Sequence, residues 1–145
     1  MPLKTLRIIT ISITGRDEAR LDDIRIWAHE AGITDLSKIG YNYLVTKKGI
    51  VQVGRPVQDG FIEIVLHGKR QFTGKQMRAL NEFIQCLKDV YSFKGAKLKL
   101  FKMFRREDFM TPPFPDIEVE YSADPLMITE GTKRNRRVGK IARKK

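Results

Sequence analysis

The chain has 145 residues, 41% of them hydrophobic, which is typical of one folded domain. Its apolar runs are far too short to span a bilayer, so no membrane partner is expected. The amino terminus lacks the apolar core of a signal peptide, and the single Cys86 excludes an internal disulfide. We therefore expect a protein that is not secreted by a signal peptide and works in a reducing compartment or independently of redox state.

The net charge of +11 is unevenly distributed along the chain. Lys and Arg number 28 against 17 acids, and eight of the 28 lie in residues 132–145, which contain no acid. The first 131 residues, with the other 20 cations, therefore carry only +3. Basic tails of this kind are solvated arms that commonly meet a polyanion. The residues expected to bind a partner are Lys133, Arg134, Arg136, Arg137, Lys140, Arg143, Lys144 and Lys145.

The amino-terminal segment has the pattern of a strand followed by a helix. Residues 3–14 interleave β-branched and polar side chains, which is typical of a strand, and Gly15 ends it. Residues 20–31 place apolar side chains three and four positions apart, as on one face of a helix. Gly32 is well suited to the position directly after the end of this helix. Trp27 falls on the apolar face and is expected in the core.

The next segment predicts three strands. Residues 40–45 and 50–53 are expected to pair across a turn in which Gly49 supplies a positive φ. A short loop over residues 55–60 leads to residues 61–66, whose continuous apolar run is typical of a buried strand.

The last third of the chain predicts a helix and two strands. Thr73 is expected to cap a helix over residues 74–91, in which apolar side chains recur at helical spacing. Residues 97–101 predict a strand, and residues 104–115, with three prolines, predict irregular backbone. Residues 117–121 alternate apolar and acidic side chains, which indicates an edge strand.

In sum, the pattern predicts an α/β domain with a central mixed, twisted β-sheet flanked by helices. The domain is expected to cover residues 1–125, followed by a basic C-terminal arm over residues 126–145.

Six segments stand in an order that is found in a known enzyme family. They are residues 24–27, 39–45 (with Gly40-Tyr41-Asn42-Tyr43), 51–55 (ending in Gly54-Arg55), 62–66, 72–76 (Phe-Thr-x-x-Gln) and 110–116. Over roughly residues 7–117, this order resembles the N-acetylmuramoyl-L-alanine amidases, which include phage amidase-type lysozymes and peptidoglycan recognition proteins. The resemblance implies their α/β fold.

The resemblance also implies where a zinc ion would lie. In this family a His at the end of the first strand, a His after the last strand and a Cys or acid before a proline hold the metal, whose water attacks an amide. Carried onto this chain, these positions fall on Ser12, near Phe101 and Lys102, and on Pro112, while the assisting Lys falls on Met110. Such residues cannot hold zinc, so we expect a vacated cleft with no metal, no cofactor and no catalytic residue. Tyr41 matches the family's active-site tyrosine and is expected to serve packing or a hydrogen bond.

Other candidate side chains favour structural roles. His29, beside Glu30, is interpreted as a surface residue and His67 as a solvated turn residue. Cys86 is expected to pack against the sheet as a small apolar side chain. The pair Asp22-Asp23 is interpreted as favouring a helix N-terminus.

The segment of residues 94–106 interleaves six cations with Phe101 and Phe104, and Phe93 directly precedes it. Cations with aromatic side chains suit nucleic-acid backbones and stacked bases. The alternation of Leu98 and Leu100 with Lys97 and Lys99 favours instead a half-buried strand with its lysines outward.

The function that we expect is that of a non-catalytic structural or adaptor component, in a virion or in the host cytoplasm. The family resemblance suggests a bacteriophage particle, with the basic arm docking onto another virion protein or nucleic acid. One alternative is a peptidoglycan-binding pseudoenzyme, disfavoured by the short loop at residues 56–60 and the missing signal peptide. Another is a nucleic-acid-binding or transcription-modulating protein.

Overall fold

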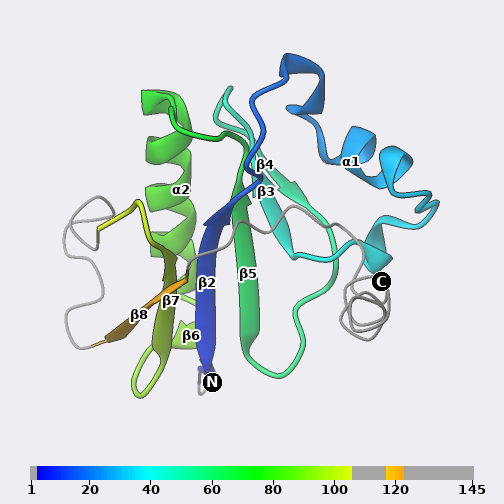
Figure 1. Ribbon diagram of the computed structural model, residues 1–145. Helices are drawn as coiled ribbons and strands as arrows, with labels where there is room; N and C mark the ends of the chain where they lie inside the picture. Colours follow the sequence, from blue (N-terminus) through cyan, green and yellow to red (C-terminus); the bar gives the residue numbers. More distant parts are fainter. Residues whose placement is uncertain (1–2, 106–116, 123–145) are drawn as a thin grey trace, which may run out of the picture.

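A six-stranded mixed sheet organises residues 3–105 and 117–122, the ranges that the computed structural model describes (Figure 1). The strands and helices are β1 (Lys4–Thr5), β2 (Ile8–Ile13), α1 (Ile24–Glu30), β3 (Tyr43–Val45), β4 (Val51–Val53), β5 (Phe61–Leu66), α2 (Gly74–Leu87), β6 (Tyr91–Ser92), β7 (Lys97–Phe101) and β8 (Glu118–Ser122). Two short 3-10 turns lie at Ala19–Leu21 and Leu36–Lys38. The sheet order is β4-β3-β5-β2-β7-β8, and β1 pairs separately with β6. The chain is therefore an α/β protein, as predicted.

Strand β2 lies inside the sheet, between β5 and β7. It pairs in parallel with β5 from Ile8 opposite Phe61 to Ile13 opposite Leu66, and in parallel with β7. β3 and β5 are also parallel, as are β7 and β8. Within the described ranges, only the β3–β4 hairpin is antiparallel. Its turn contains Gly49 at φ 85°, as the sequence predicts.

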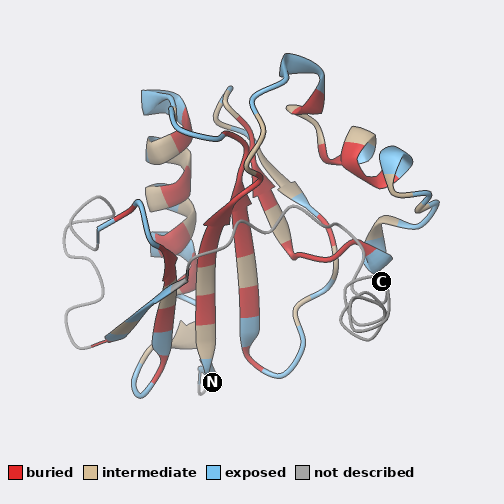
Figure 2. Ribbon diagram, in the orientation of Figure 1, coloured by how far each residue is buried: buried red, intermediate tan, exposed pale blue. Residues whose placement is uncertain are grey.

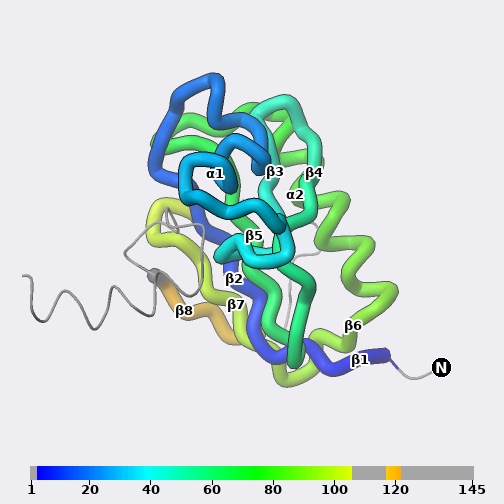
Figure 3. The backbone as a smooth tube through the Cα atoms, turned by 90° about the vertical axis from the view of Figure 1, so that its right-hand side faces the viewer, coloured from blue at the N-terminus to red at the C-terminus, as the bar shows by residue number. Residues whose placement is uncertain are grey.

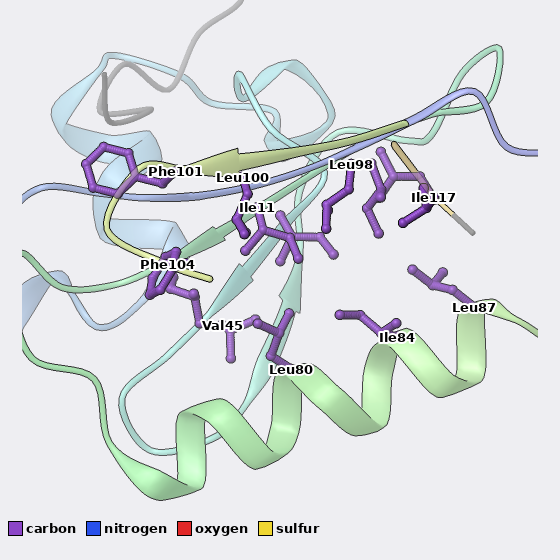
Figure 4. Packing of buried hydrophobic residues seen from close by; sticks show 14 of the residues in the cluster. Ile11, Val45, Leu80, Ile84, Leu87, Leu98, Leu100, Phe101, Phe104 and Ile117 are labelled. Atoms are coloured by element: carbon purple, nitrogen blue, oxygen red, sulfur yellow. The ribbon is translucent and has the colours of Figure 1, made fainter. Parts of the chain in front are cut away.

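Helix α2 covers one face of the sheet with a stripe of apolar side chains. Leu80 and Ile84 are completely buried, and Leu87 nearly so. They pack toward side chains of the strands, including Ile11 and Leu100 (Figure 4). Burial of these aliphatic side chains away from water is a main source of the domain's stability.

The start of α2 is fixed by a capping box and by a buried amide. The Thr73 hydroxyl accepts a hydrogen bond from the Gln76 backbone N–H, and the Gln76 side chain accepts one from the Thr73 N–H. The Gln76 side-chain amide also donates to the carbonyl oxygens of Val45 and His67, each at 2.9 Å. Gln76 thus connects the start of α2 to the ends of β3 and β5 by hydrogen bonds.

Helix α1 covers the opposite face, over β3 and β5 (Figure 3). Its buried Ile24 and Trp27 pack with Leu44 and Val65 of those strands, so Trp27 is a core residue as predicted. Since β5 is covered on both faces, it is buried along most of its length (Figure 2). Asp23 caps α1 by accepting a hydrogen bond from the Arg25 N–H, which confirms its expected place at a helix N-terminus.

Two predicted elements have different ends in the structure. The predicted strand over residues 3–14 is split into β1 and β2, because the N–H groups of Arg7 and Ile8 both turn to the Gly60 carbonyl. The predicted helix over residues 20–31 begins only at Ile24, after a 3-10 turn.

The predicted helix over residues 74–91 ends at Leu87. Tyr91 continues the apolar spacing but belongs to β6, where it pairs with Lys4. The strand predicted over residues 40–45 covers only β3. At Asn42 the side-chain oxygen, and not a backbone carbonyl, accepts the hydrogen bond from the Glu63 N–H.

The strands predicted at residues 61–66 and 97–101 are confirmed as β5 and β7, and the predicted edge strand is β8, shifted by one residue. On β7, Leu98 and Leu100 are buried while Lys97 is exposed, so the half-buried interpretation holds for this part of residues 94–106. Cys86 is exposed, which contradicts the expectation that it packs against the sheet. It lies between the buried positions of α2, on its solvent side.

Gly54 and Gly74 provide a matched test of packing at the β3–β4 hairpin. A Cβ at position 54 would lie 2.5 Å from Ile39 Cγ2 and 2.7 Å from the Tyr41 carbonyl oxygen, whereas a Cβ at Gly74 would meet nothing within 4 Å. Gly54→Ala should therefore lower the free energy of unfolding by about 1–3 kcal/mol, the usual cost of overpacking. Gly74→Ala should leave it unchanged or raise it by up to about 1 kcal/mol. Denaturant unfolding of both variants measures the difference, and equal stabilities would contradict this packing.

Candidate functional site

Strands β3, β5, β2 and β7 run in parallel, so their carboxyl ends meet at one edge of the sheet. The loops that follow them, residues 46–50, 67–73, 14–23 and 102–105, form what we call the carboxyl edge, at the top of Figure 1. In α/β sheets, ligands commonly bind outside the carboxyl ends of the strands. The position matched to the family's first zinc ligand, Ser12, also lies close to this edge.

Acidic side chains hold the loops of the carboxyl edge together. Asp17 Oδ1 accepts hydrogen bonds from Lys47 Nζ at 3.0 Å and from the Lys69 backbone N–H at 2.9 Å. The hydrogen bond from Lys47 is the main cause that lowers the pKa of Asp17. Asp22 Oδ1 accepts from the Lys47 N–H at 2.6 Å. These carboxylates therefore act as structural acceptors between loops.

His67 is completely buried, so its expected place as a solvated turn residue is wrong. Its Nε2 lies 2.9 Å from the Glu18 carbonyl oxygen and its Nδ1 lies 3.0 Å from the Thr14 hydroxyl. Because a carbonyl only accepts, Nε2 carries the proton, and Nδ1 accepts from the hydroxyl in the neutral ring. Trp27 packs edge-on against the imidazole, with centroids 6.1 Å apart. Burial lowers the pKa of His67.

Ser12 and Phe101 stand side by side on β2 and β7. The last registered pair of these strands is Ile11 with Leu100, and the next position on each strand places Ser12 beside Phe101. Both are buried, with 2% and 7% of their surface exposed. Figure 4 shows Phe101 on the other side of β7 from Leu100. The Ser12 hydroxyl has no hydrogen-bond partner among the described residues.

Tyr41 is completely buried in the cluster beneath α1, together with Ile24, Trp27 and Val65. Val65 is also the β5 residue that pairs with Ser12, so the two positions border the same part of the sheet. The Tyr41 hydroxyl is buried without a hydrogen-bond partner in the described ranges, and burial raises its pKa. Packing is therefore the role that the geometry gives to this side chain.

The remaining positions of the expected cleft are not assembled with these two. Lys102 is exposed in the turn after β7. Met110 and Pro112 lie outside the described residues, as do all eight basic residues expected to bind a partner in the arm. His29 is exposed on α1, as the sequence predicts.

The side chains at Ser12 and Phe101 do not fit a zinc ion. A phenyl ring offers no ligand atom, and zinc sites use thiolates, imidazoles and carboxylates. Within residues 3–105 and 117–122, no three His, Cys, Asp or Glu side chains come close enough together to hold a metal ion. The nearby His67 uses both ring nitrogens in hydrogen bonds.

The sequence patterns do not single out three exposed cations at the carboxyl edge, Lys48, Lys69 and Arg70. Each lies within four residues after the end of a strand. This position could have identified them once the strands were known to be parallel.

No helix of the described ranges is long and apolar enough to cross a bilayer. In comparisons with known proteins, no protein-family model and no curated protein matches the chain.

The buried His67 predicts a pH dependence of stability. Because its pKa in the folded chain lies below the usual 6.5, the unfolded chain binds a proton where the folded chain does not. The free energy of unfolding should therefore fall as the pH decreases from about 6.5 toward the folded pKa, and this contribution should be constant above about pH 7.5. Denaturant unfolding between pH 5 and pH 8, with an NMR titration of the imidazole, measures it.

The matched variants for this prediction are His67→Gln and His29→Gln. His67→Gln should lose the slope between about pH 5 and 6.5, whatever its absolute stability, while His29→Gln should keep it. The lowered pKa of Asp17 affects stability only at more acidic pH, because carboxylates titrate near 4. An imidazole that titrates at or above 6.5 in the folded protein would contradict the assignment.

Tyr41 allows the ring and the hydroxyl to be tested separately. Tyr41→Phe removes a buried hydroxyl that has no partner in the described residues, so stability should stay the same or rise by up to about 1–3 kcal/mol, the desolvation cost of such a group. Tyr41→Ala should cost about 3–5 kcal/mol because it empties the cluster beneath α1. Urea unfolding compares them, and a loss above about 1 kcal/mol in Tyr41→Phe would reveal a hydrogen bond.

Proposed function

We propose that this protein is a non-catalytic binding component built on an amidase-like α/β domain, with a basic arm at residues 126–145 that docks onto a partner. The partner is either another protein of an assembly or a nucleic acid. The assembly is proposed to be a bacteriophage particle, on the ground that the amidases it resembles include phage enzymes. Peptidoglycan is a less favoured ligand.

The arrangement of the family-like segments supports the amidase-like part of this proposal. The Gly40–Tyr43 and Gly54-Arg55 motifs are adjacent, because the Gly54 N–H donates to the Asn42 carbonyl and the Arg55 N–H to the Tyr41 carbonyl. The Phe-Thr-x-x-Gln motif begins α2, where Gln76 bonds the ends of β3 and β5. Each family-like motif in the described residues thus has a definite structural task.

The single observation that carries the non-catalytic part is the register of β2 and β7, whose continuation beyond Ile11 and Leu100 would bring Ser12 next to Phe101. They lie at or near the ends of β2 and β7, and the resemblance would place one zinc ligand at Ser12 and another near Phe101 and Lys102. A hydroxyl and a phenyl ring cannot replace two imidazoles, since neither supplies a nitrogen, thiolate or carboxylate donor. Without a metal at this position, no metal-bound water would have the lowered pKa that attack on an amide requires.

The charge distribution supports an anionic partner for the arm. Residues 132–145 contain eight cations and no acid. This excess of positive charge would attract phosphates or an acidic protein surface.

The proposal is tested on the full-length protein purified without chelator. Elemental analysis should find zinc well below one atom per chain, and muropeptides should not be cleaved, because Ser12 and Phe101 supply no ligands. Stoichiometric zinc together with cleavage would overturn the proposal.

A second experiment tests the role of the arm in binding. A full-length variant with all eight arm cations replaced by Gln should lose partner binding, measured with labelled nucleic acid and with purified particles, while its melting temperature stays within a few degrees of the parent. If this variant bound nucleic acid and purified particles as well as the parent does, the role of the arm would be refuted. Muropeptide binding without cleavage would instead favour the peptidoglycan alternative.

A further inference from the structure

The loops of the carboxyl edge converge through specific contacts. Asp17 binds both Lys47 and the Lys69 backbone, and the Thr73 hydroxyl donates to the Lys47 carbonyl oxygen at 2.6 Å. Phe72, in the loop after β5, packs against Phe104 beyond β7, with centroids 5.3 Å apart. Loops from four strands therefore lie along one continuous edge, at the top of Figure 1.

Besides Arg20, which pairs with Glu30, and Arg105, four exposed cations occupy this edge: Lys48, Lys69, Arg70 and Lys102. They come from the turn after β3, the loop after β5 and the turn after β7. None of the four forms an ion pair with another described residue. Their charges are therefore not neutralised by the part of the chain that the structure describes.

The acidic side chains of the same loops already form ion pairs or hydrogen bonds within the protein. Asp17 pairs with Lys47, and Glu18 pairs with Arg16. Hydrogen bonding from Arg16 lowers the pKa of Glu18 to about 2, so this carboxylate stays ionised and paired near neutral pH. Asp22 accepts the Lys47 backbone N–H. The edge is consequently a positively charged surface.

We propose that Lys48, Lys69, Arg70 and Lys102 form a binding surface for the phosphate backbone of a nucleic acid, separate from the basic arm. The cations are distributed along a row of strands rather than gathered around one point. Adjacent strands are about 4.8 Å apart, so the three intervals from β3 to β7 span about 14 Å. One nucleic-acid strand carries a phosphate about every 3.4 Å of axis, so this row matches about four phosphates.

The test replaces these four residues by Gln in the full-length chain and measures binding of a labelled 20-nucleotide strand and a 20-base-pair duplex over a range of salt concentrations. The matched control replaces four exposed lysines outside the carboxyl edge, Lys4, Lys38, Lys94 and Lys97. Starting from 28 cations and 17 acids, either variant carries 24 cations and a net charge of +7, so total charge is equal.

In the edge variant, the slope of log affinity against log salt should become less steep by about 2.8 for the single strand and about 3.6 for the duplex, as expected for four lost phosphate contacts. The control should keep a slope close to that of the parent. If the quadruple variant does not fold, as judged by circular dichroism, Lys102→Gln alone should change the slope by about 0.7–0.9.

Three results would overturn the proposal. The first is an edge variant with the slope of the parent, which would leave all nucleic-acid binding to the arm. The second is an equal change in the control variant, which would show that only net charge matters. The third is binding to anionic phosphatidylserine vesicles without binding to either nucleic acid. A full-length variant with a neutralised arm that still binds, and loses this binding when the edge is also changed, would support the proposal directly.

Discussion

The parallel pairing of β2 with β5 on one side and β7 on the other determines the rest of the described structure. These ladders satisfy the backbone groups of a strand whose alternate side chains Ile9, Ile11 and Ile13 are buried beneath α2. A slip by one residue would turn these three side chains to the opposite face, so the register is strongly specified. Because the strands run the same way, every loop after them reaches the same edge. The place of the candidate site is thus a consequence of strand direction.

Sequence patterns predict the elements best where local and tertiary preferences agree. The apolar run of β5 is found in full, since a strand buried on both faces is apolar at nearly every position. The end of α2 is missed because Tyr91 continues the helical spacing, while its pairing with Lys4 depends on a strand nearly ninety residues earlier. Local patterns do not contain that information.

The candidate site is less predictable from sequence than the fold, for the same reason. His67 was expected in solvent because Gly68, Lys69 and Arg70 follow it, yet Thr14 and Trp27, from distant parts of the chain, enclose its ring. That Ser12 and Phe101 come next to each other follows only from continuing the register of β2 and β7. The positive edge likewise needs the strand directions before its cations can be placed together.

Two buried hydroxyls, those of Ser12 and Tyr41, lower the stability of the domain. Ser12 and Tyr41 each bury an oxygen without a partner in the described residues, and each such group costs about 1–3 kcal/mol. For a domain whose whole stability is of the order of 10 kcal/mol, that is a large fraction. Apolar packing around Tyr41 and Phe101 contributes stability that offsets this cost.

The central position of the first long strand also has a consequence for biosynthesis. Ile8 pairs with Phe61, 53 positions later, and with Lys97, 89 positions later, so β2 is made long before either neighbour exists. At about 5–20 residues per second, the ribosome needs roughly 4–18 s to supply the second of these partners. During that interval β5 becomes available first, and the other edge of this apolar strand remains without its final partner until β7 has been made.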